Sequence, residues 1–299
     1  MGLNANMRGK SGFLHKAARG LNRVGQVLTG KQTAGRNLTV FEDDVFVVSY
    51  PRSGNTWTRF LIGNLINPDD PLTFANVESR IPEIYFNPDH KMRALPRPRV
   101  LKSHESFQPH YPKVIYIVRD PRDVAVSYYH HAVKWGNVGD GSPMEEFIPR
   151  FIAAEFDRKW GSWADNVLSW LYMRENSADF LLLRYEDMKK NTVDELRRVA
   201  DFLARAGVAG VTTDAKRLER ATELSSSERM RELEKTQAKA WVLTKQTRQD
   251  KPFVRSATAG GWKNTLNAAS VARLEEAWGP VMKKLSYPLQ TENSLQTIR

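Results

Sequence analysis

One short stretch of the chain gathers cationic and polar side chains at a tight turn between an apolar run and a helical pattern. It comprises residues 50–57, with the sequence YPRSGNTW. The free N–H groups and the positive dipole end of the following helix would face this turn, and Arg52 adds a fixed positive charge. Helix capping would explain Ser53 or Asn55 alone, but not the flanking Arg and Trp. We therefore predict an anion site, although the Gly-x-x-x-x-Gly-Lys-Ser/Thr loop of kinase-type proteins is absent.

A second candidate pair is Lys102 and His104, which end and follow a short apolar run. Ligand sites of open α/β sheets collect just past the ends of strands. A lone histidine is more often structural or merely exposed. Paired titratable groups at a strand end, however, indicate tuned acid–base chemistry, and the two interpretations stand level at this point.

A third pair is Arg119, at the end of another apolar run, and Ser127, two turns into the helix predicted to start near Pro121. Their side chains could meet at one phosphate group. The alternative is that Arg119 pairs with Asp120 or Asp123 and that Ser127 is a small packing residue. This segment alone does not decide between the two.

The elements that must position these residues can be read from apolar patterning. Runs at 45–48, 99–102, 113–119 and 180–184 have the composition of buried strands, and helical patterns separate most of them. The Pro-rich stretch 67–98 predicts irregular connection with short helix, and the polar stretch 238–260 predicts a loop. Strands that alternate with helices indicate an α/β fold, a single domain with a central parallel β-sheet flanked by helices.

The composition excludes several classes of protein. A chain of 299 residues with 41% hydrophobic residues can bury a sizeable core. The absence of cysteine excludes disulfides, thiolate zinc sites and a cysteine nucleophile, and it fits a reducing cytoplasm. No run of 18 or more apolar residues occurs, so we predict no membrane-spanning helix.

The net charge of +11 is concentrated at the N-terminus. Residues 1–36 hold seven Lys and Arg and no Asp or Glu, whereas the rest of the chain is nearly balanced. Charge therefore does not demand a nucleic-acid partner. We predict a basic N-terminal arm over 1–36, with an amphipathic helical pattern at 13–29, and one domain over 37–299. The arm could touch an anionic membrane surface, pack on its own domain or fray.

Four separated stretches resemble the soluble (cytosolic-type) sulfotransferases, which use 3′-phosphoadenosine-5′-phosphosulfate (PAPS). Residues 50–57 resemble their 5′-phosphosulfate loop, a P-loop-like strand–loop–helix, and residues 116–130 resemble their 3′-phosphate motif. Lys102-Ser103-His104 is similar to the Lys-Thr-His that carries their catalytic base, and residues 255–264 resemble their C-terminal loop. Four matches in order, each on a predicted strand or loop, make a specific signal.

The resemblance implies a role for each matching residue. His104 would accept the proton of an acceptor hydroxyl or amine during in-line attack on sulfur, while Lys102 and Arg52 would neutralise developing charge. Trp57 and Tyr185 would bracket the adenine, and Ser127 would help to bind the 3′-phosphate. No metal would be needed, because a sulfuryl group carries less charge than a phosphoryl group. The residues implied to bind PAPS, or its product PAP, are Arg52, Ser53, Gly54, Asn55, Thr56, Trp57, Arg119, Ser127, Tyr185, Ser225, Arg255, Ser256 and Ala257.

This chain departs from the family pattern at several positions. Arg52 stands where the family usually has Lys, and Arg stays protonated, so only a clamp and hydrogen-bond role is expected. The family's Thr-Ser-Phe in the adenine pocket corresponds to residues 225–227, which are all Ser and otherwise read as a helix-capping box ending at Glu228. Ala257 replaces a Gly, and Gly261 replaces an Asp. The family's short dimer motif is essentially missing around Asn267, so we expect no dimer through that surface.

The sequence therefore predicts a PAPS-dependent sulfotransferase that acts in the cytoplasm, with peripheral membrane contact as an option for the arm. Two alternatives remain: a P-loop-like nucleotide phosphotransferase, and a nucleotide-binding protein whose catalysis has decayed. No motif names the acceptor. A small molecule or a glycolipid is expected, and the oligomeric state stays open.

Overall fold

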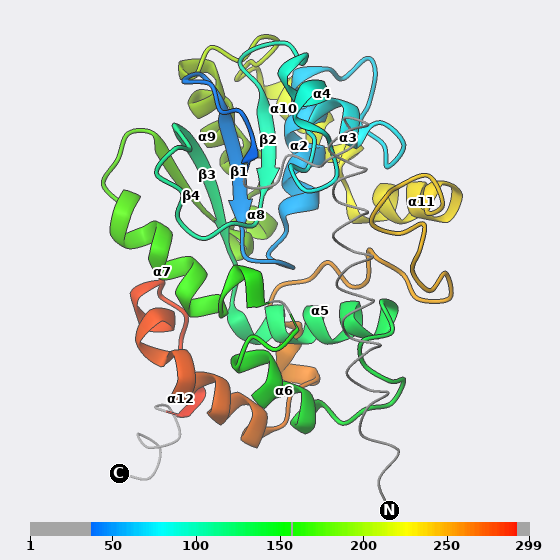
Figure 1. The fold of residues 1–299 in the computed structure, drawn as a ribbon, viewed down its shortest axis with the longest axis vertical. Coiled ribbons are helices and arrows are strands. Elements are labelled where there is room, and N and C mark those ends of the chain that lie inside the picture. Colours follow the sequence, from blue (N-terminus) through cyan, green and yellow to red (C-terminus); the bar gives the residue numbers. More distant parts are fainter. Residues whose placement is uncertain (1–36, 157, 292–299) are drawn as a thin grey trace, which may run out of the picture.

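In the part of the chain that the computed structural model describes, residues 37–156 and 158–291, the centre is a parallel sheet of four strands (Figure 1). The predicted arm, with its helix at 13–29 and its membrane contact, lies outside these residues. The strand order is β2-β1-β3-β4. The strands are β1 (Val45–Ser49), β2 (Val100–Ser103), β3 (Lys113–Val118) and β4 (Phe180–Arg184). This confirms the predicted parallel α/β fold, with each strand within one residue of its predicted run.

The register of the sheet brings the predicted chemistry to one edge. Val48 pairs with Ser103 on one side and with Tyr116 on the other. The carboxyl ends of β1, β2 and β3 are therefore level, and the chain leaves them toward helix α5 (Pro121–Lys134), as Figure 1 shows. Because ligand sites of parallel sheets form at this edge, residues from three separate predicted motifs can meet there.

One face of the sheet is covered by helices α2 (Asn55–Ile66), α9 (Thr192–Arg205) and α10 (Ala215–Leu224). Successive side chains of a strand point to opposite faces, and Val45 and Val47 point to this one. They pack with Leu61 and Leu65 of α2 and Leu203 of α9. The dense β-branched composition of the strands reflects this burial on both faces.

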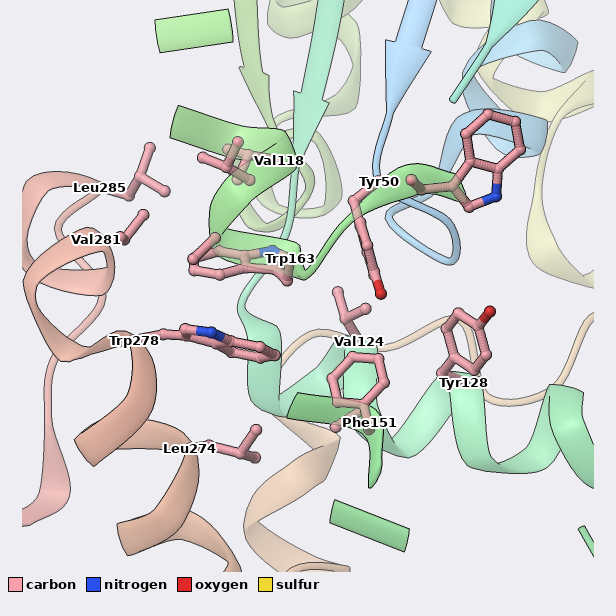
Figure 2. Close-up of a cluster of buried hydrophobic side chains, with 14 of the residues drawn as sticks. Tyr50, Val118, Val124, Tyr128, Phe151, Trp163, Leu274, Trp278, Val281 and Leu285 are labelled. Atoms are coloured by element: carbon pink, nitrogen blue, oxygen red, sulfur yellow. The ribbon is translucent and has the colours of Figure 1, made fainter. Parts of the chain in front are cut away.

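The other face packs against α5 and helices α6 (Met144–Ile152), α7 (Trp163–Arg174) and α12 (Ala268–Lys284). Figure 2 shows the aromatic part of this core, with Trp163 and Trp278 lying between the end of β3 and α12. Their ring centroids are 5.5 Å apart. Tyr50, directly after β1, packs with Tyr128 and Phe151 in the same cluster and so anchors the turn that follows it.

The remaining elements in the described part of the chain are four helices and two single turns outside the sheet and its main helical layers. The stretch 67–98 forms irregular chain with two short helices, and residues 238–260 contain no helix or strand, both as predicted. The structure shows no helix in the described residues that is long and apolar enough to cross a membrane. The helices not yet named are α3 (Val77–Arg80), α4 (Asp89–Arg93), α8 (Tyr185–Lys190) and α11 (Ser227–Gln237), and single turns lie at Arg158–Trp160 and Gly261–Asn264.

A buried ionic group fixes the start of α5. Arg122, 1% exposed, pairs with Asp120 at 2.6 Å and with Glu275 of α12 at 2.7 Å. Its guanidinium also lies 3.9 Å from the centroid of the Trp262 ring. A buried Arg is tolerated only when its charge is paired in this way, so the group holds α5, α12 and the C-terminal loop in one arrangement.

Candidate active site

The turn between β1 and α2 has the geometry of an anion cradle. Arg52 and Gly54 both adopt left-handed backbone, with φ of 70° and 102°. A Cβ on Gly54 would lie 2.6 Å from Cδ2 of Tyr185, so only Gly fits where the loop approaches that ring. Arg52 adopts this conformation without being Gly, and strained backbone of this kind is concentrated at functional sites.

The start of α2 carries no side-chain cap among the described residues, so the capping explanation of Ser53 and Asn55 is wrong. Asn55 instead donates from Nδ2 to the Val47 carbonyl and to Ser49 Oγ, at 3.1 and 3.2 Å. This ties the helix to the strand and leaves the first backbone N–H groups of α2 to face the turn.

A cavity of about 640 Å³ opens in front of this turn. It collects every predicted site residue except Ser53, which is fully buried and whose hydroxyl has no hydrogen-bond partner in the described chain. The predicted residues on the wall are Arg52, Gly54, Asn55, Thr56, Trp57, Lys102, His104, Arg119, Ser127, Tyr185, Ser225, Arg255, Ser256 and Ala257.

Two arginines and a serine meet at the mouth of the turn. Arg52 Nε donates to Ser127 Oγ at 3.2 Å, and Arg119 donates to the Arg52 carbonyl at 3.2 Å. The Arg119 guanidinium lies 4.3 Å from the centroid of the Tyr185 ring, and its Nε has no partner within the described residues. Asp123 approaches Arg119 only to 4.0 Å. Arg119 and Ser127 therefore line the same cavity, each hydrogen-bonded to Arg52, and Asp123 makes only a loose ion pair with Arg119.

Burial and neighbouring positive charge lower the pKa of two of the arginines that line the cavity, Arg52 and Arg255. Burial and then the neighbouring Arg119 lower the pKa of Arg52 to about 10. Arg255 is shifted in the same direction, first by burial and then by Arg119. Arg52 nonetheless stays protonated at neutral pH. Repulsion among these positive charges favours binding of an anion, because an anion placed between them relieves the repulsion.

His104 is oriented as a base. Its Nδ1 lies 2.7 Å from the Ser49 carbonyl oxygen, and its backbone N–H donates to the Tyr85 hydroxyl. Burial, and then the charge of Lys102, hold the pKa of His104 well below its usual 6.5, so the ring is neutral. A carbonyl oxygen only accepts, so the single ring proton sits on Nδ1. The lone pair is therefore on Nε2.

Lys102 has a partner that the sequence analysis missed. Its Nζ lies 2.5 Å from Oε2 of Glu83, and both side chains are almost completely buried. Burial lowers the pKa of Lys102, and Glu83 opposes that shift. Nothing in the spacing indicated this pair, because Glu83 comes from the irregular stretch 67–98 and reaches Lys102 by lying beside β2.

The predicted adenine side is built from α2, α8 and the junction of α10 with α11. The rings of Trp57 and Tyr185 meet edge to face, with centroids 5.7 Å apart, and Trp57 Nε1 donates to the Ser225 carbonyl. The expected capping box at 225–228 is wrong by one residue, since Ser226 caps α11 by accepting from Arg229 N–H. Ser225 instead belongs to the end of α10, where its hydroxyl donates to the Ala221 carbonyl and accepts from Asn64 Nδ2.

Comparison with known proteins identifies the family. A family model described as "Sulfotransferase domain" matches residues 42–286, most of the chain. The chain belongs to the sulfotransferase family. Sulfotransferase 1B1 of Mus musculus is 28% identical over 259 residues, covering 81% of this chain and 83% of the relative. Sulfotransferase 1C2 of Homo sapiens is 29% identical over 259 residues, covering 82% and 84%.

Solved sulfotransferase structures share the fold. Mouse sulfotransferase SULT7A1 complexed with PAP superposes with a TM-score of 0.65 at 24% identity, covering 84% of this chain and 87% of that chain. Retinol dehydratase in complex with androsterone and inactive cofactor PAP gives 0.66 at 22% identity, covering 83% and 82%. The chain is accordingly a PAPS-dependent sulfotransferase, and the phosphotransferase and decayed-protein alternatives are not favoured.

The C-terminal loop of this sulfotransferase is held over the cavity by α5. Asp123 accepts hydrogen bonds from the N–H groups of Gly260 and Trp262, at 2.6 and 3.0 Å. Arg231 of α11 donates to the carbonyls of Arg255 and Ser256. The sequence analysis recognised the loop but not these two residues that fasten it. Asp123 was considered only as a partner of Arg119.

Ala257 lies within this loop in left-handed backbone, with φ of 51°. A Cβ is disfavoured there, so we expect Ala257→Gly to raise the free energy of unfolding by about 0.5–1 kcal/mol. Chemical denaturation of both proteins checks this. Ala259→Gly is the control, since Ala259 is not among the residues with positive φ. A gain from Ala259→Gly equal to that from Ala257→Gly would contradict the explanation.

The wall nearest His104 is aromatic. Trp160 lies edge-on to His104 with ring centroids 5.8 Å apart and packs against Tyr85, and Phe156 and Tyr128 also line the cavity. These residues come from three segments: the stretch 67–98, helix α5 and the connection between α6 and α7. His131, one turn beyond Ser127 on α5, lines the same cavity.

Proposed function

We propose that this sulfotransferase transfers the sulfuryl group of PAPS to a hydroxyl of a small-molecule acceptor, with His104 as general base. The donor supplies the sulfuryl group and leaves as PAP. The supporting observation is that one cavity holds the neutral imidazole of His104, the ammonium of Lys102 and the strained turn at Arg52.

The residues of this chain divide the work. Nε2 of His104 takes the acceptor proton as the acceptor oxygen bonds to sulfur and the bond from sulfur to the bridging oxygen breaks. Arg52 and Lys102 stabilise the charge that gathers on the bridging and sulfuryl oxygens. The N–H groups at the start of α2 hold the 5′-phosphate.

Selectivity for the donor comes from its 3′-phosphate. We assign that group to Arg119, Ser127 and Arg255, which the fold brings to the same wall. The free Nε of Arg119 supports this assignment, because a buried guanidinium N–H without a partner is costly unless a ligand accepts it. ATP and adenylyl sulfate lack the 3′-phosphate and leave these donors unpaired.

The acceptor that fits best is a small, mainly apolar molecule with one hydroxyl near His104. The aromatic wall of Tyr85, Trp160, Phe156 and Tyr128 supports this class. Solved neighbours of the same fold were crystallised with androsterone and with retinol. His131 lines the same space with its Nδ1 unpaired in the described chain, so a second polar group on the acceptor would be satisfied there.

Donor binding and transfer test this function directly. Calorimetry should show that PAP binds and that ATP and adenosine 5′-phosphosulfate bind at least about 100-fold more weakly, since the charge-assisted bonds to the 3′-phosphate are lost. Incubation with ³⁵S-labelled PAPS and a panel of phenols, alcohols, glycans and lipids then identifies the acceptor class. Equal affinity for PAP and ATP would contradict the assignment of the 3′-phosphate site.

A further inference from the structure

The ammonium of Lys102 pairs with the carboxylate of Glu83, and main-chain hydrogen bonds fix the position of that carboxylate. Lys102 donates its backbone N–H to the Pro82 carbonyl at 2.8 Å, and its own carbonyl accepts from Ile84 N–H at 3.2 Å. These two bonds flank Glu83 and make it pair with Lys102 as a neighbouring strand residue would. The 2.5 Å contact between their side chains is thus set by the main chain.

The main chain of Glu83 is itself fixed by hydrogen bonds to two side chains. Its N–H donates to Glu78 Oε2 at 2.8 Å, and its carbonyl accepts from Asn87 Nδ2 at 3.0 Å. Glu78 is in turn fixed by Arg59 at 2.8 Å and by Trp241 Nε1 at 3.1 Å. The backbone of Glu83 is therefore anchored to α2 and to the stretch 238–260, and its carboxylate has little freedom to swing away from Lys102.

The groups around Lys102 show why its protonation depends on the Glu83 carboxylate. The charged and titratable groups around Lys102 are Glu83, Glu78, Arg59, His104 and His131. Burial and Arg59 disfavour the ammonium, and the nearby imidazoles are neutral and offer no negative charge. Glu83 is the largest influence in the opposite direction. Without it, a buried ammonium loses its proton rather than bear the cost of desolvation.

We propose that Glu83 is a positioning residue for sulfuryl transfer, which holds Lys102 charged and aimed at the place of the sulfuryl oxygens. An ammonium has three donors, and one bond to Glu83 leaves two for a ligand. This inference rests on the role proposed for Lys102. The added point is that the carboxylate of Glu83, a residue outside the four motifs, stabilises the buried positive charge of Lys102 before any ligand binds.

The first test needs no acceptor. Protein labelled with ¹³C at lysine Cε gives one signal per lysine, and the signal missing from Lys102→Gln belongs to Lys102. In Glu83→Gln we expect the Lys102 signal to titrate about 1–3 pH units lower than in the unmodified protein, because an opposite charge is removed. Glu83→Asp, which keeps the charge, should recover part of this shift. An unchanged titration in Glu83→Gln overturns the proposal.

The second test separates positioning from a merely structural role. With any active acceptor, the alkaline fall of kcat in Glu83→Gln should begin about 1–3 pH units lower, following the titration of Lys102. In a Lys102→Gln background, Glu83→Gln should cause no further loss of kcat, whereas additive losses would overturn the proposal. PAP lacks the sulfuryl group, so its affinity should change by less than about threefold. Failure of the unmodified protein to bind PAP would instead refute the proposed function.

Discussion

Replacement of His104 by Ala is expected to lower kcat by about 10²–10⁴-fold, the usual contribution of a general base. The neutral ring presents Nε2 to the cavity because Nδ1 is committed to the Ser49 carbonyl at 2.7 Å. Steady-state transfer of ³⁵S from labelled PAPS measures the loss, and PAP affinity verifies that the donor site is intact.

The pH profile of the unmodified enzyme gives the same prediction a second readout. Because burial and Lys102 lower the pKa of His104 well below its usual 6.5, the base stays unprotonated as the pH falls to 6.5. The acid limb of kcat/KM should lie below that value and vanish in His104→Ala. His90→Ala, which removes an exposed histidine of α4, is the matched control and should behave as the unmodified enzyme. An acid limb above 6.5 would contradict the orientation and burial of His104.

Replacement of Arg52 by Met is expected to lower kcat by about 10²–10³-fold, as removal of one preorganised donor to a developing negative charge does elsewhere. Arg52 is held ready by Ser127 and by the ring of Phe253, 4.7 Å from the guanidinium. The proposed role of Arg52 is to stabilise the charge that the bridging oxygen gains in the transition state. The replacement should therefore lower kcat by a larger factor than it raises the KM for PAPS. Steady-state rates with PAPS varied at saturating acceptor separate the two.

The variant Arg52→Lys is more informative than Arg52→Met, because the resemblance implies Lys as the usual residue of the family at this position. It keeps the charge but loses the planar fork that engages Ser127, and an ammonium releases its proton more readily than a guanidinium in the same surroundings. We expect it to retain activity within about tenfold of the unmodified enzyme and to acquire a steeper alkaline limb. Arg197→Met, on the exposed face of α9, is the control. Arg52→Met with unchanged kcat would show that Arg52 only shapes the turn.

Local patterns were enough to predict the strands and the site motifs. The β-branched runs at 45–48 and 113–119 favour buried strands of a parallel sheet, and the polar turn after each then lies at its carboxyl edge. Capping was harder to predict. Ser226 rather than Ser225 caps α11, because α10 extends to a C-cap at Ser225 and α11 can begin only after it.

By itself the sequence determined the fold class and the family, because the family motifs and the strand–turn–helix pattern are both local, and it predicted which residues would carry the chemistry. The tertiary structure alone decided what surrounds them. Strand order, the carboxylate of Glu83 against Lys102, the fastening of the C-terminal loop by Asp123 and the aromatic wall beside His104 all join segments far apart in the chain. Such contacts depend on how the elements pack, and a buried charge finds its partner only when the chain has folded around it.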